Sequence, residues 1–255
     1  MEILNNEESM KFVDGKRKFI EQVKKDRLIF EPFYKDFTYR FCWNSNAIEG
    51  NTLSLDETIS LLEYDEVRSG HTYSEYEEAK RLNQAISEML SERYTEITEE
   101  WLVKAVHLIT GRYKEYRTDD VYIGTMIEAV YYPPSFSSVP KLMSQFIADI
   151  GFVQDSVKDV IEKTAKAHIE FERIHPFHDG NGRTGRLMLN QMLLNGGLLP
   201  ITFSDQSKYR QAFRRYERNQ DLSLMVYLIC KGQKEAIKNI EKLCSKREKS
   251  RNRQM

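Results

Sequence analysis

The stretch from His175 to Arg186 carries the side chains best suited to chemistry in this 255-residue chain. It reads His-Pro-Phe-His-Asp-Gly-Asn-Gly-Arg-Thr-Gly-Arg, and so combines an imidazole, a carboxylate, glycines and two arginines. The ordinary pKa of a histidine is ~6.5, so the ring of His175 is mostly neutral at pH 7 and can accept a proton. Arg183 and Arg186 share a helix face, where each can hold a phosphate through paired hydrogen bonds. These residue types predict a polyphosphate site with a general base beside it.

The pattern around this stretch places its glycines at a helix N-terminus. Apolar residues recur at helical spacing over 158–174, Pro176 and Gly180 end that helix, and a second helix begins near Gly182. The first N–H groups of a helix lack partners and carry partial positive charge, and glycine lets an anion approach them closely. Asp179 would repel a phosphate but suits Mg²⁺ or Mn²⁺, because Mg²⁺ takes most of its ligands from water and substrate. The loop therefore predicts a phosphate cradle with a metal at its edge.

Two familiar nucleotide motifs overlap the same glycines and are rejected. Residues 180–185 fit G-x-G-x-x-G, but a helical pattern precedes them where the dinucleotide motif requires a strand. The same spacing begins a P-loop, which then fails because Arg186 and Leu187 stand where Lys and Ser or Thr are required. A Rossmann site and a P-loop are therefore excluded.

The stretch resembles the signature of the Fic family, H-x-F-x-[DE]-G-N-G-R-x-x-R, at every fixed position. The matching residues are His175, Phe177, Asp179, Gly180, Asn181, Gly182, Arg183 and Arg186. The resemblance implies that His175 is the general base, Asp179 the metal ligand and Arg186 the ligand of the γ-phosphate. The residues that it implies for ATP binding in this stretch are Asp179, Gly180, Asn181, Gly182, Arg183, Thr184, Gly185 and Arg186. Most members of this family transfer AMP from ATP to a protein hydroxyl, so the expected activity is that of a protein adenylyltransferase.

A second motif, Ser45-x-x-x-Glu49-Gly50, lies at the end of an earlier helix. Taken alone, it is commonly a surface carboxylate beside a helix-ending glycine. It also resembles the [ST]-x-x-x-E-[GN] motif of the Fic family's inhibitory helix, which implies that Glu49 pairs with Arg186 and competes with the γ-phosphate. A buried ion pair of ~3–5 kcal/mol would suppress the rate by ~10²–10³. We therefore expect autoinhibition, as in the subgroup whose inhibitory helix precedes the catalytic core, and its release by Glu49→Gly.

The segment 117–134 interrupts the helical pattern. Two runs within it, 121–124 and 128–132, are rich in β-branched and aromatic residues, which predicts a short β-hairpin. The hairpin resembles the flap by which Fic enzymes align a target segment through backbone pairing. By this analogy, the residues near the nucleotide are Val121, Tyr122, Ile123 and Gly124. Tyr209 is the candidate to stack on adenine, although its surroundings depart from the doubled tyrosine of some relatives.

The rest of the chain has helical signals. We expect one helix over 10–30 and another from Pro32 to Gly50, since proline suits a first helical turn. Capping boxes predict helix starts at Ser54-x-x-Glu57 and Ser74-x-x-Glu77, with a further cap at Thr98. Later helices are expected over 140–151, 207–219 and 221–244, and a charged, frayed tail follows them.

These signals predict a mostly α fold, a Fic-like helical bundle with a short β-hairpin flap. We divide the chain into N-terminal helices with the inhibitory helix (1–50), a Fic catalytic core (51–221), and a C-terminal helix with a basic tail (222–255). The resemblance to the family covers residues 45–221.

Composition narrows the compartment and the partners. The net charge of −1 gives no general attraction to nucleic acid or to an anionic membrane. The thiols of Cys42, Cys230 and Cys244 are odd in number and lack metal-binding spacing, so we expect them to be buried or free. Neither a signal peptide nor an apolar run of ~18 residues is evident, which favours the cytoplasm. The expected partner is a protein with a Ser, Thr or Tyr hydroxyl, which can be the enzyme itself, and a homodimer is left open.

Three alternatives stay open on the same residues. Phosphotransferase branches of the family typically carry Lys where Gly182 stands, which argues against phosphate transfer. Removal of AMP, with Glu49 orienting a water molecule, is a second alternative. The third is a silent nucleotide-binding interaction module, against which the intact His175 and Asp179 count. The sequence names neither the target protein nor the preferred base.

Overall fold

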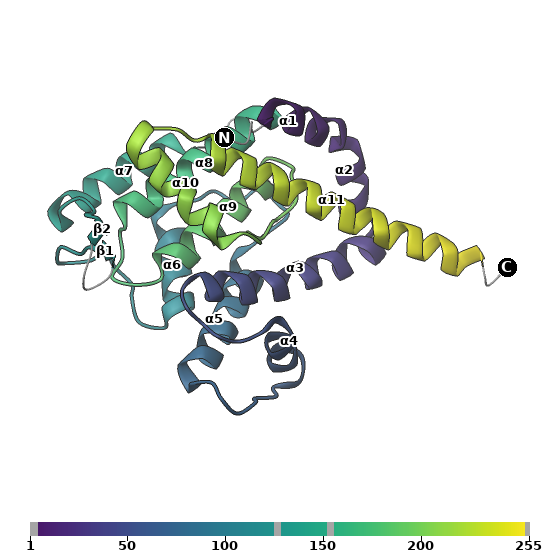
Figure 1. Cartoon of the computed structure of the whole chain (residues 1–255), viewed down its shortest axis with the longest axis horizontal. Helices are drawn as coiled ribbons and strands as arrows, with labels where there is room; N and C mark the ends of the chain where they lie inside the picture. Colours follow the sequence, from purple (N-terminus) through teal and green to yellow (C-terminus); the bar gives the residue numbers. More distant parts are fainter. Residues whose placement is uncertain (1–4, 125–128, 152–155, 253–255) are drawn as a thin grey trace.

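The computed structural model describes residues 5–124, 129–151 and 156–252. In chain order its elements are α1 (Asn6–Gly15), α2 (Arg17–Lys25), α3 (Arg27–Ile48), α4 (Leu55–Tyr64), α5 (Tyr73–Met89), α6 (Glu99–Thr110), β1 (Ile123–Gly124), β2 (Ala129–Tyr131), a 3-10 turn η1 (Phe136–Ser138), α7 (Val139–Asp149), α8 (Val157–Ile174), α9 (Asn181–Asn195), α10 (Gln206–Asn219) and α11 (Ser223–Asn252). Figure 1 shows helices gathered around α9, the small hairpin at one edge, and α11 projecting past the body toward the C-terminus. The expected fold class, helical with a short hairpin, is confirmed.

Helix α9 is the central element of the fold. Apart from Gly182, its residues from Asn181 to Leu194 are buried, and it packs against α8, α6 and α3. Leu187 belongs to an apolar cluster shared with α5, α6 and α8, whereas Leu189 belongs to a second cluster shared with α8, α10 and α11. A helix that is covered on all sides has little freedom to move. Its N-terminus, which carries the glycine-rich stretch, is therefore held in a fixed place.

Helix starts follow local capping chemistry. The capping box of Ser54 and Glu57 opens α4 as expected, and Thr98 caps α6. The predicted box at Ser74 is wrong, because α5 begins two residues earlier with Thr72 as its cap and Glu75 as its partner. The carboxylate of Glu75 also accepts hydrogen bonds from Thr52, at 2.8 Å from its nitrogen and 2.6 Å from its hydroxyl. The contact between Thr52 and Glu75, which lie far apart in the sequence, favours the start of α5 at Tyr73.

Both predicted N-terminal helices have different bounds in the structure. The single helix expected over 10–30 is divided at Lys16 into α1 and α2. Helix α3 begins at Arg27, where the Asp26 side chain accepts from the nitrogen of Leu28 at 3.1 Å. Pro32 therefore lies inside α3 rather than in its first turn, because the aspartate cap decides the start.

The two ends of the chain pack onto each other and onto the core. Ile20 of α2, Phe33 of α3 and Ile237 of α11 share one apolar cluster. Helix α11 continues to Asn252, so the tail expected to fray after residue 244 is helical as far as the structure describes it. An ion pair of 2.5 Å joins Arg247 of that extension to Asp26, which holds the extension against the N-terminal end of α3.

The hairpin forms as predicted in its described part. Strands β1 and β2 are antiparallel, with Ile123 opposite Tyr131 and Gly124 opposite Ala129 in an irregular register. The turn between them, with Glu128 of the second predicted run, lies outside the described residues.

The three cysteines are free, and Cys42 and Cys230 are buried, as expected. None of the helices in the described ranges combines the length and the apolar character that a bilayer span requires.

Candidate active site

His175 sits where α8 ends and the glycine-rich loop begins. It occupies the C-cap with φ of 49°, in the left-handed region, and its nitrogen donates to the Phe171 carbonyl at 3.0 Å. Its own carbonyl accepts from Nε of the buried Arg117 at 2.9 Å. A non-glycine residue rarely adopts a positive φ unless its surroundings fix it. These contacts therefore fix the backbone of His175 between α8 and the glycine-rich loop.

The surroundings of His175 keep its ring neutral. Burial lowers its pKa below the ordinary 6.5, and the positive charge of Arg117 acts in the same direction. The carboxylates of Glu49 and Asp179 oppose this shift without reversing it. A neutral imidazole at pH 7 is the protonation state that a general base needs.

Asn181 serves the loop through its side chain. Its Oδ1 accepts from the Phe177 nitrogen at 2.9 Å, and its Nδ2 donates to the Phe177 carbonyl at 2.7 Å. Both ends of the amide are thus engaged, which leaves the backbone N–H of Asn181 and the second hydrogen of Nδ2 for the expected contact with phosphate. The clamp sets the path of the chain between His175 and α9.

Two glycines keep the N-terminus of α9 accessible. Gly180 has φ of 78°, and a Cβ there would lie 2.8 Å from the Thr110 methyl group. At Gly182 a Cβ would lie 2.2 Å from Glu49 Oε1 and 3.0 Å from Arg186 Nη1. Both glycines lie at the start of α9 as expected, and their role as a phosphate cradle stays a prediction. In this structure the carboxylate of Glu49 occupies the space in front of it.

Arg186 is buried and fully engaged. Its Nε donates to Ser45 Oγ at 2.8 Å, and its Nη2 donates to the Ser45 carbonyl at 2.9 Å and to Glu49 Oε1 at 2.6 Å. Its Nη1 donates to the Tyr209 hydroxyl at 3.2 Å. Burial works against its charge, but Tyr209 and Glu49 raise the pKa of Arg186 above its ordinary 12.5. The two ends of the second motif, Ser45 and Glu49, thus meet on one guanidinium.

Glu49 is ionised but only partly buried. Burial alone would raise its pKa, yet the charge and hydrogen bond of Arg186 lower it below the ordinary 4.5. Its side chain is 39% exposed, against 2% for Arg186. The estimate of ~3–5 kcal/mol applies to a fully buried pair. Because solvent screens the carboxylate, the Glu49–Arg186 contact is worth less than that estimate.

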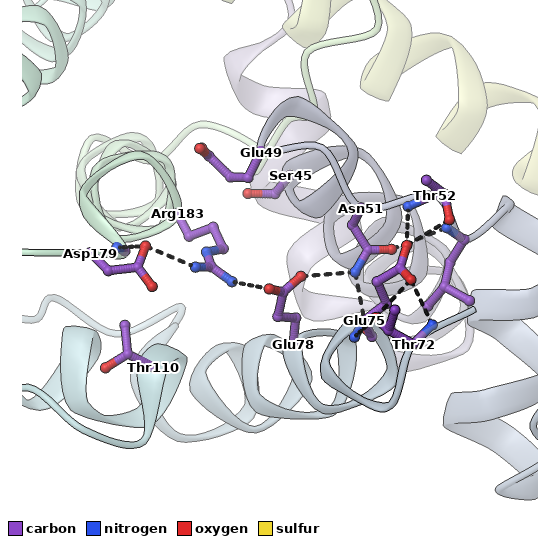
Figure 2. Close-up of polar contacts among 12 residues, drawn as sticks. Ser45, Glu49, Asn51, Thr52, Thr72, Glu75, Glu78, Thr110, Asp179 and Arg183 are labelled. Atoms are coloured by element: carbon purple, nitrogen blue, oxygen red, sulfur yellow. Dashed lines mark hydrogen bonds and ion pairs between the residues drawn. The ribbon is translucent and has the colours of Figure 1, made fainter. Parts of the chain in front are cut away.

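Arg183, in contrast, keeps hydrogen-bonding capacity in reserve. It is 5% exposed, and its Nε and Nη1 have no hydrogen-bond partner among the described residues. Its Nη2 lies 3.4 Å from Asp179 Oδ1, and its Nη1 lies 4.0 Å from Glu78 Oε1 (Figure 2). Buried donors without acceptors are costly unless a ligand satisfies them. An anion at the start of α9 would supply the missing acceptors.

Asp179 fits the single carboxylate that Mg²⁺ needs beside a phosphate. Its side chain is 61% exposed, and only its Oδ1 accepts hydrogen bonds from the described residues, from Gly180 and Arg183. The described part of the chain contains no group of three or more His, Cys, Asp or Glu side chains arranged for a metal. A metal at Asp179 would therefore rely on water and phosphate oxygens for its other ligands.

Three residues of the expected ATP site face inward instead. Thr184 is 0% exposed and its nitrogen donates to the Gly180 carbonyl, while a Cβ on Gly185 would meet Glu172, Phe171 and His168 of α8. Helical geometry turns both residues away from the cradle, which contradicts direct contact with ATP. Tyr209 is 3% exposed and packs against Phe203, with ring centroids 4.8 Å apart. Its burial contradicts stacking on adenine, and its hydroxyl supports Arg186 instead.

Sequence reasoning missed two supporting residues. His168 is buried in the core, and its Nε2 contacts the Tyr209 hydroxyl at 2.7 Å. Burial lowers its pKa to about 3, so it is neutral. Glu78 of α5, which faces Arg183, is one acid among several in a charged helix. No local signal distinguishes Glu78 from its neighbours, since the contact forms only when α5 packs near α9.

Hydrogen bonds join the hairpin to the glycine-rich loop and to the end of α8. The guanidinium of Arg117 donates to the carbonyls of His175 and Pro134, one on each side of the junction. The Tyr131 hydroxyl donates to the Arg173 carbonyl at 3.2 Å, two residues before His175. These contacts set the hairpin beside the backbone of residues 173–175. The contact expected between residues 121–124 and the nucleotide stays a prediction.

The chain is similar to known proteins of one family. Residues 73–193 match the Fic/DOC family. A protein adenylyltransferase Fic of Culex quinquefasciatus is 31% identical over 184 residues, which cover 69% of this chain and 36% of that protein. The protein of the same name from Aedes aegypti is 28% identical over 206 residues, covering 78% of this chain and 40% of the relative. The chain thus spans less than half the length of these curated relatives.

Two solved structures resemble most of the chain. A Fic domain containing signaling protein from Bacteroides thetaiotaomicron superposes with a TM-score of 0.79 at 23% identity, covering 93% of this chain and 97% of that one. A Fic family protein from Desulfovibrio desulfuricans gives a TM-score of 0.73 at 25% identity, covering 96% of this chain and 74% of that one. The first likeness establishes the fold, including the helices that flank the matched residues.

Proposed function

The chain carries a domain of the Fic/DOC family over residues 73–193, and on that premise we propose that it is a protein adenylyltransferase. It transfers AMP from ATP to a Ser, Thr or Tyr hydroxyl of a protein. The proposal rests on the residues at the two ends of the glycine-rich loop. The neutral imidazole of His175 lies at its first end, and the N-terminus of α9 with two buried arginines lies at its other end.

In the proposed reaction, His175 takes the proton of the acceptor hydroxyl. The oxygen attacks the α-phosphorus of ATP, a new P–O bond forms, and the bond to pyrophosphate breaks. Negative charge that develops on the phosphates is held by the first N–H groups of α9 and by the free donors of Arg183. The chemistry is mainly positioning and charge stabilisation, as in other phosphoryl transfers.

Asp179 is the proposed holder of Mg²⁺, or Mn²⁺ in its place. Its exposed carboxylate stands beside the donors of Arg183 and the start of α9. A bound divalent ion would neutralise phosphate charge and make pyrophosphate a better leaving group. Asn181 keeps the loop in shape through its two bonds to Phe177, and so holds Asp179 and His175 at a constant separation.

Glu49 is the proposed internal inhibitor. Its carboxylate occupies the space before Gly182 and bonds the guanidinium of Arg186 that would hold the γ-phosphate. It competes with that phosphate for the same donors and repels it by charge. Triphosphate binding in the productive position therefore requires the Glu49 side chain to move away.

The flap supports a protein as acceptor. Strand β1 belongs to a two-stranded sheet, so its outer edge pairs with no other strand among the described residues, and Tyr122 beside it is 54% exposed. An exposed strand can pair with the backbone of an incoming segment, which fixes its hydroxyl without reading its sequence. The acceptor can be this protein itself. The two buried thiols and the need for ATP and Mg²⁺ fit a cytoplasmic setting.

Removal of AMP is a second candidate for the same site. The carboxylate of Glu49 is ionised, partly exposed and directed at the cradle. In that position it can orient a water molecule toward the phosphorus of a protein-bound AMP. The reaction needs Glu49, whereas AMP transfer is released by its loss, so Glu49→Gly separates the two functions.

The experiment that tests the proposal compares the Glu49→Gly variant with the variant that also carries His175→Ala. Each is incubated with ATP, Mg²⁺ and a cell lysate, and proteins are examined by mass spectrometry. We expect a mass gain of one AMP group on hydroxyl side chains with the first variant alone. A gain of one phosphate would assign phosphotransfer, and no gain would leave the silent module as the better account.

A further inference from the structure

The segment that carries Glu49 also contacts Arg183 indirectly, through residues of α5. After α3 ends, Gly50 adopts φ of 101°, and the chain turns so that Asn51 faces α5. Asn51 Nδ2 donates to Glu78 Oε2 at 2.9 Å and to the Glu75 carbonyl at 3.0 Å. Figure 2 shows the continuous line from Asn51 through Glu78 to Arg183.

Glu78 is well placed to act on Arg183. Asn51 holds one oxygen of its carboxylate, and the other oxygen lies 4.0 Å from Arg183 Nη1. Asp179 lies on the other side, 3.4 Å from Nη2. The guanidinium is thus held by charge from two sides, while neither carboxylate takes up its Nε or Nη1 in a hydrogen bond. Its donors stay free for a ligand.

The surroundings of this group are open to solvent on one side. Glu78, Arg183 and Asp179 help to line a pocket of ≈ 420 Å³ between the start of α5 and the end of α6. Without a fixed negative charge on the α5 side, the guanidinium could shift into that space or move toward Asp179. A long side chain loses several rotamers when it is held in one position, so its placement needs such a support.

We propose that Glu78 is a positioning residue that holds Arg183 in its phosphate-binding orientation, and that Asn51 orients Glu78. This inference deepens the proposed function and rests on it for the identity of the ligand, the polyphosphate of ATP. The segment from Ser45 to Asn51 therefore reaches both motif arginines. It contacts Arg186 directly through Ser45 and Glu49, and it contacts Arg183 through Glu78.

The test uses the Glu49→Gly variant as its reference, because inhibition is then absent. Glu78→Gln is added, which keeps the shape and removes the charge. We expect the KM and the Kd for ATP to rise about fivefold, the upper range for a partly exposed charge pair, with kcat nearly unchanged. If Glu78 instead competed with phosphate, both constants would fall.

A double-mutant cycle separates positioning from a general structural effect. In a background with Arg183→Gln, the Glu78→Gln change should cost no further ATP affinity. Asn51→Ala should weaken binding as Glu78→Gln does, and the two together should be no worse than Glu78→Gln alone. The matched control is Glu77→Gln, on the same helix and pocket, whose carboxylate pairs with Arg81 at 3.0 Å. It should leave both constants unchanged.

Calorimetry measures the Kd for ATP without requiring AMP transfer, so it tests the role of Glu78 separately from the proposed function. If the Glu49→Gly reference binds ATP but transfers no AMP, the proposed function fails while the Kd still tests Glu78. An unchanged or lowered Kd in Glu78→Gln, or an equal loss in the Arg183→Gln background, would overturn the positioning role. Thermal unfolding of every variant identifies any loss that comes from a damaged fold.

Discussion

Replacement of Glu49 by glycine should strengthen ATP binding by a factor that the contact geometry sets. The lost bond to Arg186 Nη2 is charged and short, at 2.6 Å, but Glu49 is 39% exposed. A charged hydrogen bond is worth ~1.5–3 kcal/mol, and exposure favours the lower end. Relief of repulsion between Glu49 and the γ-phosphate adds about 1 kcal/mol at partly screened separations.

Together these contributions amount to about 2.5 kcal/mol, which corresponds to a gain in affinity of about 70-fold. This is less than the ~10²–10³ expected for a fully buried pair. Arg186 should stay in place in the variant, because Ser45 and Tyr209 still accept three of its hydrogen bonds. The backbone should tolerate the change, since Glu49 has φ of −88° and caps α3 without strain.

Isothermal calorimetry with ATP and with AMP gives the assay its internal control. The gain should appear with ATP and be nearly absent with AMP, because only the terminal phosphate competes with Glu49. The ATP affinity of Glu49→Gln should lie between those of the wild type and Glu49→Gly, since the amide keeps the size of the side chain and loses its charge. Equal gains for ATP and AMP, or no gain for either, would refute the argument that Glu49 blocks the γ-phosphate position.

The remaining predictions concern the base and its supports. His175→Ala in the Glu49→Gly background should abolish AMP transfer and leave ATP affinity within about twofold, since the ring acts on the acceptor hydroxyl. In the same background the rate should fall at low pH with a midpoint below pH 6.5, because burial lowers the pKa of His175 and the neutral ring is the base; a midpoint at or above pH 6.5 would contradict this. Tyr209→Phe should cost about 1–3 kcal/mol of unfolding free energy in urea titrations, because it leaves a buried donor of Arg186 without its acceptor. Asn181→Ala breaks both bonds to Phe177 and should lower thermal stability and AMP transfer together, whereas an effect on stability alone would remove its role in shaping the loop.

The local structure of this site could be predicted from the sequence, because one short stretch contains it. Helical spacing on both sides of the loop, with two glycines between, placed the glycines at the start of α9 correctly, and their contact with phosphate stays a prediction. The pairing of Glu49 with Arg186 followed from a family motif and is present in the structure. A capping box likewise placed the start of α4 correctly, because capping is local chemistry.

Contacts between distant segments could not be read in the same way. The side chain of Tyr209 was expected at the surface of the nucleotide site, but packing of α10 on α8 buries it under Arg186. The start of α5 was misplaced because two overlapping boxes fit the sequence equally, and only the contacts of Thr52 with Glu75 favour one. Glu78 lacked any signal at all, since its importance depends on the distance between α5 and α9.

The central claim is that the acceptor hydroxyl receives AMP from ATP while His175 takes the proton of that hydroxyl. The most direct measurement incubates the Glu49→Gly variant and an acceptor protein with ATP that carries ³²P at either the α or the γ position. We expect the acceptor to gain label from α-labelled ATP only, and we expect His175→Ala to remove that label. Label from the γ position, or α label that persists without His175, would contradict the account.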